Sequence, residues 1–139
     1  MKLLRYDNKN QQIGSGMIGE LKEPMKAKKF LKFVKEAMDT PMIRHTALLD
    51  KTVQRIAVCG GAGSFLLNKA IGAQADVFVT ADYKYHQFFD ADNQIIIADI
   101  GHYENEQYTI DLIANELKKK FSSFAFLLTD TNTNPINYL

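Results

Sequence analysis

Hydrophobic and polar positions follow two alternating periods along this chain, and these periods predict where its strands and helices lie. Four apolar segments typical of buried strands lie at 53–61, 76–82, 94–100 and 124–130. Three segments with helical spacing separate them, at 64–73, 83–93 and 104–121. The alternation predicts an α/β fold with a mainly parallel sheet in residues 53–128, right-handed crossovers and helices on both faces.

The first fifty residues predict one further helix and short strands whose places in the sheet the pattern does not give. The strands are expected at 3–7, 17–21 and 42–47. Apolar residues recur every three or four positions from Ala27 to Met38, with Pro24 placed to start that helix. Its lysines fit an anionic partner, although a solvated helix face is the favoured interpretation.

Composition sets the class of protein. The 139 residues are enough for one domain, which we expect to span 1–139. A net charge of +1 predicts no strong attraction to nucleic acid or to membranes. A single cysteine, Cys59, and the lack of a long apolar segment indicate a cytoplasmic protein.

Polar residues collect where three of the predicted strands end. The first strand runs into Gly60, Gly61, Ala62, Gly63 and Ser64, the second into Thr80, Ala81 and Asp82, and the third into Asp99, Gly101 and His102. Because the carboxyl ends of parallel strands share one edge of a sheet, we expect these motifs to meet there.

The first two motifs each allow two interpretations. The glycine segment is either a tight turn with Ser64 as a helix N-cap, or a loop whose backbone N–H groups hold an anion. Asp82 is either a helix cap, which is favoured, or shares one face with His86 four residues later. His45 has no acidic companion nearby and is interpreted as structural.

His102 and Glu106 form the sharpest pair, because residues four apart on a helix point the same way. An imidazole and a carboxylate on one face can bind a transition metal or transfer protons. The alternative is ordinary enrichment of acidic residues, Glu104 and Glu106, at a helix start. We favour the metal interpretation, although a catalytic metal usually takes at least three protein ligands.

Five segments, in this order, resemble the C-terminal part of the NIF-three-like family, whose members often carry the name GTP cyclohydrolase I type 2 homologue. They are GSGMIGELKEPM, IAVCGGAGSFL, ADVFVTADYKYHQFFDA, GHYENE and TNPI, and the similarity covers roughly residues 12 to 136. The resemblance implies one lobe of a two-lobed fold whose cleft holds two metal ions. The N-terminal lobe, which normally supplies a His-His pair and an Asp, is expected to be missing from these 139 residues.

The same resemblance implies site residues. His102 and Glu106 match the metal ligands of the family, for zinc, manganese or iron. The resemblance does not imply that this chain binds metal by itself. Residues implied to line the cleft are Gly60, Gly61, Gly63, Thr80, Asp82, His86 and Asn105. Two positions depart from the family pattern: Ala81 replaces a glycine, and Asn105 replaces a small hydroxyl residue.

Three functions follow from these expectations. The first is the C-terminal part of a dinuclear metal-dependent hydrolase, similar to a cyclohydrolase acting on a nucleotide or purine-like ring and inactive without its other lobe. The second is a non-enzymatic interaction or scaffold module. A nucleotide-binding regulatory domain that uses the glycine segment is less favoured. The apolar face left by a missing lobe predicts self-association into dimers or larger oligomers.

Overall fold

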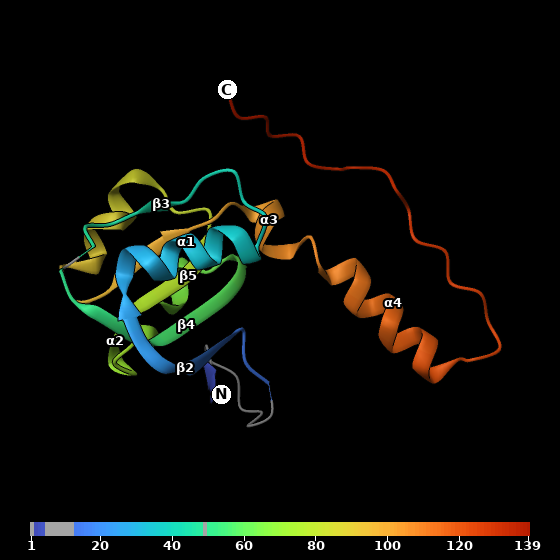
Figure 1. The fold of residues 1–139 in the computed structure, drawn as a ribbon, viewed down its shortest axis with the longest axis horizontal. Coiled ribbons are helices and arrows are strands. Elements are labelled where there is room, and N and C mark those ends of the chain that lie inside the picture. Colours follow the sequence, from blue (N-terminus) through green and yellow to red (C-terminus); the bar gives the residue numbers. More distant parts are fainter. Residues whose placement is uncertain (1, 5–12, 49) are drawn as a thin grey trace. The chain divides into compact units, whose positions relative to one another are not determined.

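A computed structural model describes residues 2–4, 13–48 and 50–139 of the chain. These residues divide into two compact units, one reaching up to Asn105 and the other comprising Glu106–Leu139. The first unit holds a mixed sheet with helices on its faces (Figure 1). The predicted α/β class is therefore confirmed.

Six strands form the sheet, in the order β1-β2-β4-β5-β6-β3. They are β1 (Lys2–Leu4), β2 (Gly16–Lys26), β3 (Arg44–His45), β4 (Thr52–Ala62), β5 (Val77–Ala81) and β6 (Ile96–Asp99). The central strands β4, β5 and β6 are parallel, while β2 pairs with β4 and β3 pairs with β6 in antiparallel fashion. The structure thus confirms the parallel centre and places the N-terminal strands at both flanks.

Hydrophobic side chains on the central strands alternate between two cores. Phe78 belongs to one cluster, whereas its neighbours Val77 and Val79 belong to the other. Since successive side chains of a strand point to opposite faces, the two clusters lie on opposite sides of the sheet. All residues of β5 and β6 are buried, which explains why both strands appear in the sequence as nearly continuous apolar runs.

Helices cover both faces. The helix α1 (Ala27–Ala37) lies over one face and buries Phe30, Leu31 and Val34 (Figure 1). The other face is covered by α2 (Leu67–Gly72), by the 3-10 helix η1 (Ser64–Leu66) and by the 3-10 helix η2 (Tyr85–Ala91). The predicted helices at 64–73 and 83–93 are therefore present, the second as a 3-10 helix.

Pro24 does not start α1, as the sequence suggested. It lies inside β2, in the stretch between Glu20 and Met25 where the pairing with β4 shifts register. A proline lacks a backbone N–H, so it is tolerated in a strand where the ladder is interrupted. The helix begins three residues later, at Ala27.

The second unit departs most from expectation. The helix predicted over 104–121 is broken, because α3 (His102–Glu106) ends before α4 (Thr109–Lys120) begins. The strand predicted at 124–130 is wrong, since residues 121–139 contain no helix or strand.

Among the residues described, no helix combines the length and the apolar character that crossing a bilayer requires.

Candidate functional site at the carboxyl edge of the parallel strands

The carboxyl ends of β4, β5 and β6 meet at one edge of the sheet. Ala62 of β4 pairs with Ala81 of β5, and Thr80 pairs with Asp99 of β6. The residues that follow these strand ends therefore start from neighbouring positions, as the edge rule for parallel sheets requires.

The glycine segment packs tightly against β5. Gly61 has a left-handed backbone, with φ of 60°, and its carbonyl oxygen accepts a hydrogen bond of 3.1 Å from the Thr80 hydroxyl. A Cβ atom at Gly63 would lie 2.3 Å from Thr80 Oγ1 and 2.8 Å from Cys59 Cβ. Steric contact thus accounts for the glycine at position 63. Anion binding by this segment stays a prediction.

Ser64 is not a helix N-cap, contrary to the first interpretation. Gly63 occupies the cap of η1, no side chain caps it, and Ser64 is the first residue within that helix. The Ser64 hydroxyl instead accepts a hydrogen bond of 3.2 Å from Gln87 Nε2. Since Gln87 belongs to η2, this bond ties the segment after β4 to the segment after β5.

Asp99 fastens two of the loops at this edge. Its side chain is only 3% exposed, and its Oδ2 accepts a hydrogen bond of 2.9 Å from the Tyr83 backbone N–H. Its Oδ1 accepts one of 3.1 Å from Gly101, and its carboxylate forms an ion pair with Arg44 of β3. Backbone donors and a guanidinium together compensate the loss of hydration of this carboxylate. Asp99 is thus a buried structural anchor beneath the site.

Asp82 and His102 form the exposed polar pair of the site. Asp82 has a left-handed backbone, with φ of 59°, which aspartate tolerates better than most residues. Its Oδ2 lies 2.6 Å from His102 Nδ1, and both side chains are about half exposed. Asp82 therefore contacts the histidine of the third motif. It is not the helix cap that the sequence favoured, because Lys84 occupies the cap of η2.

The pairing has a chemical consequence for the imidazole. A carboxylate at Nδ1 orients the ring and favours the tautomer that carries its proton on Nδ1. The lone pair then belongs to Nε2, the atom that would ligate a metal or accept a proton. Carboxylate–histidine pairs of this kind commonly support metal ligands.

Three other side chains predicted for the site are Asn105, His86 and Glu106, and they lie in different surroundings. Asn105 Nδ2 donates a hydrogen bond of 3.3 Å to the Cys59 carbonyl, so it ties α3 to β4. His86 is exposed, and its ring meets the Tyr85 ring edge-on at 6.5 Å. Glu106 is the last residue of α3 and the first of the second unit. Its role as a ligand stays a prediction.

Metal binding at this edge of the sheet stays a prediction. Within the described ranges, no group of three or more His, Cys, Asp or Glu side chains is arranged to hold a metal ion. Since catalytic metals usually take at least three protein ligands, the first unit could supply only a share of them.

Arg44 was missed by the sequence interpretation. It lies on the two-residue edge strand β3, ion-pairs with Asp99 and donates a hydrogen bond of 3.0 Å to the Tyr83 carbonyl. The sequence signal for this contact was only an arginine in a weak predicted strand. The contact itself arises from the pairing of β3 with β6, which joins residues more than fifty positions apart.

Comparison with known proteins identifies the family. The model of the Duf34/NIF3 (NGG1p interacting factor 3) family matches residues 1–135, so the chain belongs to that family. It is 33% identical over 135 residues to the GTP cyclohydrolase 1 type 2 homolog of Staphylococcus epidermidis, covering 94% of this chain and 37% of the relative. It is 35% identical over 131 residues to the protein of the same name from Bacillus subtilis, covering 91% and 35%.

Solved structures agree with the family assignment. A Bacillus cereus protein related to NIF3 superposes with a TM-score of 0.75 at 30% identity, covering 89% of this chain and 36% of that one. The Staphylococcus aureus protein SA1388 gives a TM-score of 0.78 at 28% identity, covering 91% and 42%. The chain thus spans just over a third of the length of the curated relatives and corresponds to one lobe of the larger fold.

Proposed function

We propose that this chain supplies His102 and Glu106 to a dinuclear metal site of a hydrolase, with zinc, manganese or iron as the metal. The observation that supports the proposal is the contact of 2.6 Å between Asp82 and His102 Nδ1 at the carboxyl edge of the sheet. This chain alone would be inactive, because the described residues bring together too few ligands for a complete site.

The roles of the residues follow from their surroundings. Asp82 would accept the Nδ1 proton of His102 in a hydrogen bond and orient the ring, and Nε2 would hold the metal ion. Asp99 keeps the loop before His102 in place through the Gly101 N–H. When bound, metal ions at this site would supply an activated water by lowering its pKa. His86, which is exposed, would exchange a proton with the substrate.

A nucleotide or a purine-like ring is the proposed substrate. It rests on the name GTP cyclohydrolase 1 type 2 homolog that the relatives carry, and on the sequence that they share with this chain. The missing ligands would come from an N-terminal lobe, as the family resemblance implies. The two relatives are each nearly three times as long as the region that they share with this chain.

Metal content tests the proposal directly. The chain would be joined to the remaining part of the S. epidermidis relative, and metal per protein measured by elemental analysis. We expect two metal ions, the loss of at least one in His102→Ala, and roughly 10- to 100-fold weaker metal affinity in Asp82→Asn. His45→Ala is the control, because His45 contacts only the Thr46 carbonyl among the hydrogen bonds described for it. Unchanged metal content in His102→Ala would refute the ligand assignment.

A second candidate, an interaction or scaffold module, is favoured by α4. Three apolar side chains on one face of this helix are exposed, namely Ile110, Ile113 and Leu117. An amphipathic helix usually buries such a stripe against another element or partner. This function predicts self-association of the 139-residue chain, measured by light scattering at increasing concentration. Ile113→Glu should then shift the chain toward the monomer, and a wild-type chain that is monomeric at all concentrations would count against the module.

A further inference from the structure

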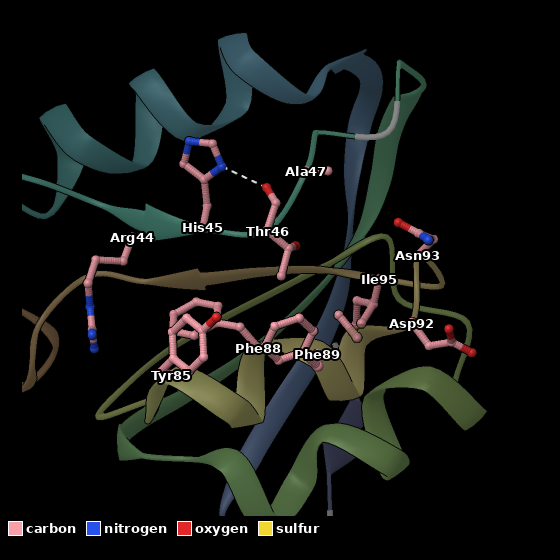
Figure 2. Close-up of a pocket in the computed structure, with 11 residues that line it drawn as sticks. Arg44, His45, Thr46, Ala47, Tyr85, Phe88, Phe89, Asp92, Asn93 and Ile95 are labelled. Atoms are coloured by element: carbon pink, nitrogen blue, oxygen red, sulfur yellow. Dashed lines mark hydrogen bonds between the residues drawn. The ribbon is translucent and has the colours of Figure 1, made fainter.

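A cavity of about 670 Å³ lies in the first unit, outside the Asp82–His102 pair (Figure 2). The segment 44–47 forms one wall, and η2 forms the other. Arg44 stands at one end, and Asp92 and Asn93 stand at the opposite end (Figure 2). The volume is that of a typical small-molecule site.

Aromatic rings of η2 line the cavity between its two polar ends. Tyr85 is 77% exposed and Phe89 is 67% exposed, although both are large apolar side chains. Their ring centroids are 5.5 Å apart, and the rings meet edge to face. Phe88 lies beside them, partly buried against the core. Rings presented in this way offer a stacking surface that the fold itself does not use.

Arg44 brings a positive charge to one end of this surface. Its Nη2 donates to Asp99 and to the Tyr83 carbonyl, and its guanidinium lies over the Phe88 ring, 5.5 Å from the centroid. A guanidinium carries five N–H donors, and no other acceptor for Arg44 occurs in the parts of the chain described. Asp99 also accepts two backbone N–H bonds, so Arg44 is not its sole partner.

We propose that this cavity binds a small molecule with a planar aromatic ring and an attached anionic group. The ring packs against Tyr85 and Phe89, with its face on one ring and its edge toward the other, and the anion accepts the remaining donors of Arg44. The carboxylate of Asp92 at the far end repels an anion there, which fixes the direction of the ligand. Stacked rings and a guanidinium favour such a molecule over an aliphatic chain, which would gain only from burial.

Neither His102 nor Asp82 lines the cavity, so the inference is independent of the proposed metal site. Its test uses the 139-residue chain and two fluorescent probes with the same ring system. One is 8-anilinonaphthalene-1-sulfonate, which carries an anionic sulfonate. The other is N-phenyl-1-naphthylamine, which lacks it. Titration of each probe gives its affinity and stoichiometry.

The variants separate the contribution of the aromatic rings to probe affinity from that of the Arg44 charge. Tyr85→Ala with Phe89→Ala should weaken both probes roughly five- to tenfold, because the stacking surface is lost. Arg44→Met should weaken only the sulfonate by about the same factor, leaving the uncharged probe within about twofold. Phe124→Ala is the control, because Phe124 is a similarly exposed ring outside this cavity. It should change neither affinity.

Two outcomes would overturn the inference. Unchanged binding of both probes in the Tyr85 and Phe89 variant would show that the cavity is not the site. The inference also fails if Arg44→Met leaves the affinity for the sulfonate unchanged, since the guanidinium would then not bind the anion. Both side chains are mostly exposed, so their removal should leave the fold intact, and Arg44→Lys provides a charged second variant should Arg44→Met unfold.

Discussion

At the carboxyl edge of the sheet, close contacts decide which residue type a position tolerates, and Gly63 is the clearest case. A methyl group there would lie 2.3 Å from Thr80 Oγ1 and 2.8 Å from Cys59 Cβ, closer than any real contact allows. Both neighbours are buried, so neither can move aside cheaply. We expect Gly63→Ala to lower the free energy of unfolding by about 1–3 kcal/mol in urea denaturation.

Gly72 offers a matched control for that substitution. It ends α2, and no atom lies within 4 Å of the position that its Cβ would take. Gly72→Ala should leave stability unchanged or raise it by up to about 1 kcal/mol, because alanine favours the helix. Equal effects of the two substitutions would refute the steric explanation.

Tyr83 leads to a prediction on pH. Burial raises the pKa of its hydroxyl far above the usual range, and the nearby charges of Asp90 and Asp99 add to the shift. Because the unfolded chain ionises first, near pH 10, the protein loses stability as the pH rises above that value. The loss should approach about 1.4 kcal/mol per pH unit until the folded protein also ionises.

Substitution of Tyr83 by phenylalanine isolates the contribution of its hydroxyl to the pH dependence of stability. The Tyr83 hydroxyl is buried and has no hydrogen-bond partner in the described structure, so Tyr83→Phe should be neutral or stabilising at pH 7. The variant should also lose less stability than the wild type between pH 9 and pH 11, as measured by urea denaturation. Tyr85→Phe, at a 77% exposed position, should behave like the wild type. A parallel decline of the wild type and Tyr83→Phe would show that other groups cause the loss.

At the scale of elements, α1 separates a core face from a solvent face. Phe30 is 3% exposed and packs with the sheet, whereas Phe33, one turn later, is 55% exposed. Phe30→Ala should therefore cost about 3–5 kcal/mol of unfolding free energy, and Phe33→Ala less than about 1 kcal/mol. Thermal and urea denaturation of both variants check the difference, and similar losses would mean that the helix does not pack as described.

The elements that the sequence predicted well are those whose signals are local. The runs Val77–Ala81 and Ile96–Asp99 are buried on both faces, so their apolar character alone indicates parallel strands. Pro24 was misinterpreted, because the register shift between β2 and β4 depends on the pairing of distant residues, which a local pattern does not reveal. The apolar segment 124–130 forms no strand, although its composition predicts one.

The sequence also predicted only part of the site. Strand ends placed Asp82 and His102 at one edge, because parallel pairing follows from the alternation of elements. Their direct contact depends on the left-handed backbone of Asp82, which no periodicity indicates. The partnership of Arg44 with Asp99 depends on the edge strand β3, only two residues long and too short to give a pattern.

For the whole molecule, burial is concentrated in the first unit. Of the buried hydrophobic side chains described, Ala114 is the only one beyond Ile100. The segment 122–139 contains no buried residue. Stability of this chain should therefore come almost entirely from the two cores on the faces of the sheet.

Truncation tests this distribution. A chain that ends at Phe121 loses eighteen residues (122 to 139) but no buried side chain, so its melting temperature should stay within about 2 °C of the full chain. Ile97→Ala, at a fully buried position of β6, is the matched comparison and should lower it by about 10 °C or more. The expectation is wrong if truncation lowers the melting temperature more than Ile97→Ala does. The tail would then stabilise the protein although none of its side chains is buried in this structure.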